Sequence, residues 1–74
     1  MIEELDRVAL TTDVPEDGLV AGDVGTVVHV HDGGAGYVVE FMSHKGETVA
    51  IATVRAAWVR PVGSRDIVHA RAMA

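Results

Sequence analysis

Three histidines are the residues of this sequence whose type and spacing come closest to a metal site. His29 and His31 are two positions apart, so on a β-strand both imidazoles point to the same face. Asp32 follows directly, and His44 could lie near them once the chain turns back. Two imidazoles and a carboxylate could bind zinc or another divalent cation. Such spacings are common by chance, and we therefore expect surface histidines, with no metal and no cofactor.

Nucleophilic catalysis has few candidate residues in this chain. There is no cysteine. Ser43 is followed directly by His44, and adjacent residues rarely reach the geometry of a catalytic triad. A small barrel fills its interior with side chains, which leaves no enclosed pocket for paired carboxylates. We therefore expect a protein without enzymatic activity.

The most specific local pattern predicts a tight turn that leads into a strand. Gly22 and Gly25 let the chain bend, and Asp23 can accept hydrogen bonds from backbone amides of the turn. The same pattern occurs in the KOW element of ribosomal and transcription proteins, where it helps to bind RNA. An RNA site of that kind needs basic and aromatic neighbours, whereas Asp17 and Asp32 lie nearby here. We therefore interpret these three residues as turn-forming.

Charge is distributed unevenly along the chain. Residues 1–54 hold ten acidic and two basic side chains, a net charge of −8, while residues 55–74 hold four arginines and one aspartate, a net charge of +3. An acidic body repels phosphate backbones and suits a basic protein partner better than a nucleic acid. Tryptophan is enriched at the centres of protein interfaces. The candidate partner-contact residues are Trp58, Arg55, Arg60, Arg65 and Arg71.

Length and composition indicate one small domain. Seventy-four residues, 49% of them hydrophobic, are enough for one thin core and too apolar for a disordered tail. The lack of cysteine excludes a disulfide framework. No apolar run reaches the length of a membrane span, and the acidic start Met1-Ile2-Glu3-Glu4 does not resemble a signal peptide. We expect a cytoplasmic protein that does not enter membranes.

Apolar residues alternate with a period of two, which predicts strands rather than helices. We expect strands at 6–10, 25–30, 37–41, 48–54 and 58–62. A long loop (11–23), turns at 32–36 and 43–47, and one helical turn at 55–57 connect them. This is the plan of an all-β, five-stranded SH3-like barrel.

The alternation also predicts which side chains share a face. Leu19 and Val20 should fold from the long loop onto the core. In the second strand we expect Val28 and Val30 on one face, with Val27 and His29 on the other. In the third strand, the residues Tyr37, Val39 and Phe41 should face the core together.

The pattern changes after Val62, so we divide the chain into a barrel (1–62) and a C-terminal tail (63–74). Ser64 could cap a short helix over residues 65–73, with Ile67 and Ala70 on one face. A helix of this length is marginal in isolation. We expect a tail that is either helical, against a partner, or disordered.

Several short segments over residues 1–62 form a fairly specific pattern together, although each segment alone is a weak signal. They are Glu4-Leu5-Asp6, Leu10-Thr11, Asp13-Val14-Pro15, Gly18-Leu19, Gly22 to Val28, Tyr37 to Phe41, Gly46-Glu47-Thr48 and Val59 to Val62. In this combination the chain resembles a family of small stand-alone bacterial proteins known only as domain of unknown function four-nine-two-six. The resemblance implies an SH3-like barrel, suggests an adaptor, antitoxin-like or accessory role, and brings no site residues.

Taken together, these patterns favour a non-enzymatic protein-interaction module, such as an antitoxin-like or accessory subunit whose partner could be encoded by an adjacent gene. The alternative is a KOW-like nucleic-acid-binding barrel that uses the four arginines. A third hypothesis is a metal or small-ligand binder that uses His29, His31 and His44. The thin core and the open strand edges would also allow a homodimer.

Overall fold

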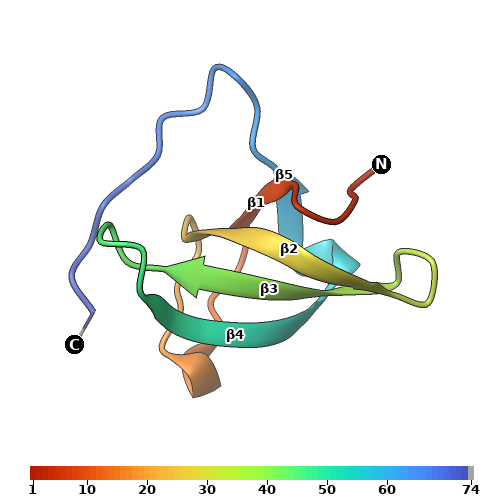
Figure 1. Cartoon of the computed structure of the whole chain (residues 1–74), viewed down its shortest axis with the longest axis horizontal. Helices are drawn as coiled ribbons and strands as arrows, with labels where there is room; N and C mark the ends of the chain where they lie inside the picture. The colour runs from red at the N-terminus through yellow and green to blue at the C-terminus, as the bar shows by residue number, and fades with distance from the viewer. Residues whose placement is uncertain (74) are drawn as a thin grey trace.

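The computed structural model describes residues 1–73, and its strands form one antiparallel sheet (Figure 1). The predicted all-β fold with five strands is confirmed. The long loop also contains a short 3-10 turn that the sequence pattern did not indicate. In chain order the elements are β1 (Arg7–Leu10), η1 (Pro15–Asp17), β2 (Val24–His31), β3 (Gly36–Met42), β4 (Thr48–Arg55), η2 (Ala56–Trp58) and β5 (Val59–Pro61).

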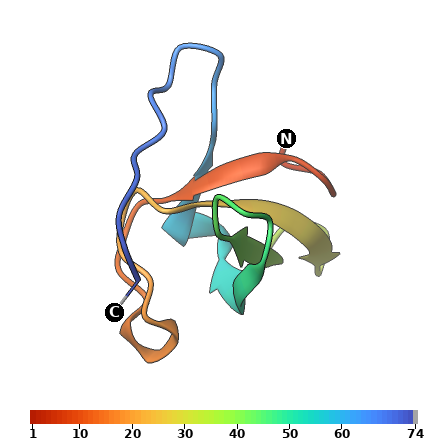
Figure 2. The ribbon, with the colours of Figure 1, turned by 60° about the vertical axis from the view of Figure 1, so that its left-hand side comes forward.

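The strand order is β4-β3-β2-β1-β5, so β4 and β5 are the two edges of the sheet. Within the described part of the chain no strand pairing joins these edges, and the sheet is therefore not closed by hydrogen bonds. Strong bending still wraps the strands around one core, as both views show (Figures 1 and 2). The arrangement is compatible with an SH3-like barrel.

A β-bulge in β2 changes which side chains face the core. The pairing passes from Val27 opposite Val39 to His29 opposite Val38, so Val28 is an extra residue without a partner. Val27 is fully buried, Val30 packs against the core, and Val28 is 40% exposed. The expectation that Val28 and Val30 share a face was therefore wrong, because the extra residue reverses the alternation.

The core lies on the concave side of the sheet and receives side chains from every strand. Tyr37, Val39 and Phe41 of β3 are all buried in it, as predicted. In β4, Ala52 and Val54 are buried in the core, while Val49 and Ile51 are exposed on the outer face. The buried core residues are Val8, Leu10, Val14, Leu19, Val27, Tyr37, Val39, Phe41, Ala52, Val54 and Val59.

The loop from residue 11 to residue 23 closes one side of the core. Val14 and Leu19 exchange two backbone hydrogen bonds of 2.9 and 3.1 Å across η1, and both side chains are buried. Leu19 therefore folds back onto the core as predicted, while Val20 is only partly buried. The loop is anchored by apolar packing, so its polar groups are held in fixed positions.

Gly25 has a different role from the one that the sequence suggested. It lies within β2, where it pairs with Val8, and its φ is outside the left-handed region. A Cβ at this position would lie 2.5 Å from Cγ1 of Val39 and 2.9 Å from the carbonyl oxygen of Glu40. Glycine is required here because β3 approaches closely, whereas Gly22, with a φ of +94°, is the true turn residue.

The tail forms no helix between residues 63 and 73 and runs as an extended segment across the molecule (Figure 1). One reason is local, because the Asp66 carboxylate accepts a hydrogen bond from the backbone N–H of Gly63 and thereby stabilises a turn. Beyond this turn the segment returns alongside the loop at residues 18–23 (Figure 2). Ala74, which we had assigned to the tail, lies outside the described residues.

Candidate functional site

The carboxylate of Asp23 is the centre of the most developed polar site on the surface. One carboxylate oxygen, Oδ2, accepts the backbone N–H of Val20 at 2.9 Å, and the N–H of Asp23 bonds back to the carbonyl of Val20 at 3.1 Å. This confirms the predicted bonding of Asp23 to its own turn. With the tail in place the side chain is only 12% exposed, and the Val20 amide orients the carboxylate from the side of the turn.

Arg71 of the tail binds this carboxylate with two nitrogens. Its Nε donates to Oδ1 of Asp23 at 2.9 Å, and its Nη2 donates to Oδ2 at 2.6 Å. The same Nη2 also donates to the carbonyl oxygen of Gly18 at 2.9 Å. A planar guanidinium that meets two carboxylate oxygens and a carbonyl is both a strong and a geometrically specific contact.

His69 adds a second tail contact to the same carboxylate. Its Nε2 lies 3.1 Å from Oδ1 of Asp23, and its ring covers Gly22. A Cβ on Gly22 would come within 2.9 Å of Cε1 of this ring. The left-handed backbone favours glycine at this position, and a side chain here would also have to displace the His69 ring.

The electrostatic consequence appears in the acidity of Asp23. The hydrogen bond from Arg71 lowers the pKa of this carboxyl to about 2, partly opposed by burial and assisted by the Val20 amide and by His69. The same bond raises the pKa of Arg71. Both groups are therefore charged at neutral pH, and the tail is held to the loop by an ion pair.

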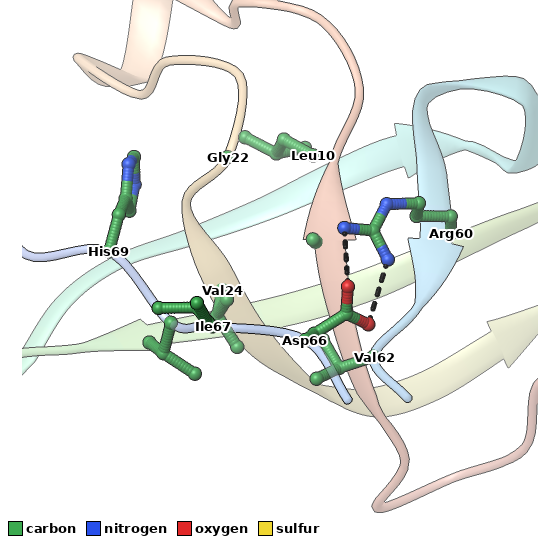
Figure 3. A pocket seen from close by; sticks show the side chains of 10 residues that line it. Leu10, Gly22, Val24, Arg60, Val62, Asp66, Ile67 and His69 are labelled. Atoms are coloured by element: carbon green, nitrogen blue, oxygen red, sulfur yellow. Dashed lines mark hydrogen bonds and ion pairs between the residues drawn. The ribbon is translucent and has the colours of Figure 1, made fainter. Parts of the chain in front are cut away.

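A second ion pair holds the start of the tail. Arg60 donates from Nη1 and Nη2 to the two oxygens of Asp66 at 3.0 and 3.1 Å (Figure 3). Next to this pair, a cavity of about 190 Å³ lies between the tail and the outer side of β1 and β2. Its lining residues include Ala9, Leu10, Gly22, Val24, Val62, Ile67 and His69.

A larger groove of about 760 Å³ continues between the second half of the tail and the sheet. Phe41 and Met42 of β3 and Leu19 of the long loop contribute to the wall opposite the tail. The tail spans this groove without filling it, since its apolar residues Val68 and Met73 remain 56% and 44% exposed. The tail is therefore attached through its polar groups more than through burial of apolar surface.

The three histidines proposed as metal candidates do not come together. His29 and His31 share a face as predicted, with ring centroids 4.7 Å apart. His44 lies in the turn beyond Met42, whereas His29 and His31 pair with the opposite end of β3. Among residues 1–73 the structure contains no group of three side chains suited to hold a metal ion.

The predicted partner-contact residues lie in separate places. Arg55 lies over the ring of Trp58, 5.8 Å from its centroid, and this partly buried ring packs against the core. Arg60 and Arg71 are engaged with carboxylates of this chain, and Arg65 is exposed. His69 and the carbonyl of Gly18 belong to the site as well, although no sequence pattern had indicated either of them. The opposite charges of body and tail were the signal that could have indicated the pairing.

No helix in the described part of the chain has both the length and the apolar character that a membrane crossing requires. A search of curated proteins found no match to the chain, and neither did a search of solved structures. A comparison with family models matched residues 4–61 to a family described as Domain of unknown function (DUF4926). This match covers more than half of the chain, and the protein therefore belongs to that family.

Proposed function

We propose that this protein is a non-enzymatic protein-interaction module of the bacterial cytoplasm, acting as an adaptor, antitoxin-like or accessory subunit. The observation that carries the proposal is the open edge strand β4, Thr48–Arg55. An edge strand presents unpaired backbone N–H and C=O groups, to which a strand of another protein can add. The contact surface in this proposal is therefore the β4 edge.

The two edges of the sheet differ in how well they are protected. The strand β5 has three residues and ends at Pro61, so it offers little backbone for pairing. The strand β4 has eight residues, contains no proline, and carries its first charge at Arg55. Proteins commonly protect an edge strand with short length, proline or charge, and β4 has none of these over most of its length.

The outward side chains of β4 support the same proposal. Val49 is 42% exposed and Ile51 is 59% exposed. Two further exposed apolar residues, Val28 and Met42, belong to β2 and β3. Apolar side chains beside an unpaired edge favour a protein partner, because a strand that pairs there would also remove them from water.

The positions of the arginines favour a protein over a nucleic acid. Arg60 and Arg71 are paired with carboxylates of the same chain, which reduces the positive charge that they offer to a phosphate. The net charge of −5 opposes a polyanion further. These features support the protein-interaction proposal.

The experiment uses a charge placed on the β4 edge. Co-purification after in-cell crosslinking would compare the wild-type chain with an Ile51→Lys variant, and Ile67→Lys would serve as a matched control on the exposed tail. We expect one partner to be recovered with the wild type and with the control, and to be lost with Ile51→Lys, while all three chains unfold at similar temperatures. Recovery of no partner above background, or equal recovery with Ile51→Lys, would contradict the proposal.

A further inference from the structure

We propose that Asp23 and the carbonyl of Gly18 form an arginine-binding site for an extended basic segment of a partner protein, which this chain's own Arg71 occupies in the absence of the partner. The site is separate from the β4 edge, because its polar groups come from the loop at residues 18–23. It therefore goes beyond the function proposed above.

The site is built by the body of the protein and does not need the tail. The Val20 amide orients the Asp23 carboxylate, and a second carboxylate, Asp13, accepts the N–H of Ala21 at 2.9 Å. The buried side chains of Val14 and Leu19 hold the same loop to the core. The acceptor groups are thus in place before an arginine arrives, which lowers the entropic cost of binding one.

The arrangement of acceptors favours arginine over lysine. Three acceptor oxygens, two from Asp23 and one from Gly18, are met by Nε and Nη2 of one planar group. The ammonium of a lysine is a single point charge and cannot reproduce these planar, paired hydrogen bonds. The residues beside the occupant, Ala70 and Ala72, are small, and they lie on the groove next to the sheet. The fitting ligand is therefore an extended peptide with an arginine between small residues.

The tail is attached in a way that allows exchange. It pairs with no strand in the described structure, and the side chain of Arg71 remains 28% exposed. Partly exposed ion pairs contribute little to stability and are screened by salt. The body carries a charge of −8 over residues 1–54, which attracts other basic segments to the same place. A partner segment can therefore displace Arg71 without unfolding the barrel.

The test measures binding of a labelled synthetic peptide, residues 64–73 of this chain, to full-length protein by fluorescence anisotropy and NMR. In the Arg71→Ala protein the internal competitor is gone, and we expect about fivefold tighter binding than to the wild type. The Arg65→Ala protein is the matched control, because Asp23 is bound by Arg71 and, within the described residues, no hydrogen bond or ion pair joins it to Arg65, and this protein should bind like the wild type. Adding Asp23→Asn to Arg71→Ala should weaken binding at least tenfold.

Two further peptides test the site without altering the protein. Versions of the peptide with lysine or alanine in place of Arg71, and with Arg65 unchanged, should each bind the Arg71→Ala protein at least tenfold more weakly. Absence of binding to that protein at millimolar peptide, binding that survives Asp23→Asn, or equal binding of the lysine peptide would each overturn the proposal.

Two controls distinguish this proposal from the β4-edge proposal and from binding to a second copy of the chain. An Ile51→Lys chain with Arg71→Ala should bind the peptide normally, so failure of the β4 proposal would leave this result unchanged. Sedimentation of the wild type should show a monomer. A wild-type dimer that Arg71→Ala abolishes would assign the site to the tail of a second copy and would overturn the assignment to a partner protein.

Discussion

The acidity of Asp23 gives a direct measure of how firmly the tail is held. The pKa of this carboxyl is about 2 in the folded protein, against 3.8 for an ordinary aspartate. Because the folded state binds the proton more weakly than the unfolded chain does, ionisation of Asp23 stabilises the fold above pH 3.8. That stabilisation should be lost as the pH falls from about 4 to about 2.

The size of the effect follows from the same numbers. A pKa that moves from 3.8 to about 2 corresponds to at most roughly 2 to 3 kcal/mol of unfolding free energy at neutral pH. Arg71 is partly exposed, and solvent screening therefore reduces the expected contribution to roughly 1 kcal/mol. A domain of 74 residues is stable by roughly 4 to 11 kcal/mol, so loss of this contact weakens the fold without unfolding it, which fits a tail that can exchange.

The assay is an NMR titration of the Asp23 carboxyl carbon in the wild type, in Arg71→Ala and in Arg65→Ala. We expect a pKa near 2 in the wild type and in Arg65→Ala, and a rise toward 3.8 in Arg71→Ala. Urea unfolding at pH 7 should show Arg71→Ala less stable by roughly 1 kcal/mol, with a smaller difference at pH 3. A wild-type pKa near 3.8, or the same pKa with and without Arg71, would refute the reasoning.

Two further predictions concern the body of the domain. Gly25→Ala should destabilise the fold by about 2 kcal/mol in urea unfolding, because its Cβ would clash with Val39, while Gly63→Ala should stay within about 0.5 kcal/mol; equal effects would contradict the role of close packing. Leu19→Ala should cost about 3 kcal/mol in the same measurement, because Leu19 is fully buried under its loop. Ile67→Ala is the control and should leave the unfolding free energy nearly unchanged. If Leu19→Ala lowered the unfolding free energy as little as Ile67→Ala does, the loop would not close the core.

The strands could be predicted from the sequence because their signal is local. Alternation of valines with polar residues places the five strands within a few residues of their positions in the structure. The bulge could not be predicted in the same way, since Val28 is one valine among several and its insertion leaves no mark in composition. Gly25 was misjudged for a related reason, because a glycine that permits close packing looks the same in sequence as one that permits a turn.

The candidate site could be predicted only in pieces. Asp23 was recognised for its bonds to the adjacent turn, and Arg71 for its place in a basic tail. Their pairing joins residues 48 positions apart, and no local pattern specifies such a contact. The extended path of the tail, which we expected to be either helical against a partner or disordered, could not be predicted for a similar reason, since the periodicity of a short segment does not show that Asp66 and Arg71 bond elsewhere.

The unpaired residue in β2 also bears on how this domain can vary in length. Because Val28 stands opposite nothing, its deletion would leave Val27, His29 and Val30 with the neighbours that they already have on β3. Loss of one residue further along the strand would instead turn an imidazole toward Tyr37. A homologue shorter by one amino acid at the bulge can therefore keep the same interior, and gaps in an alignment of the family should be better tolerated here than elsewhere in the strand.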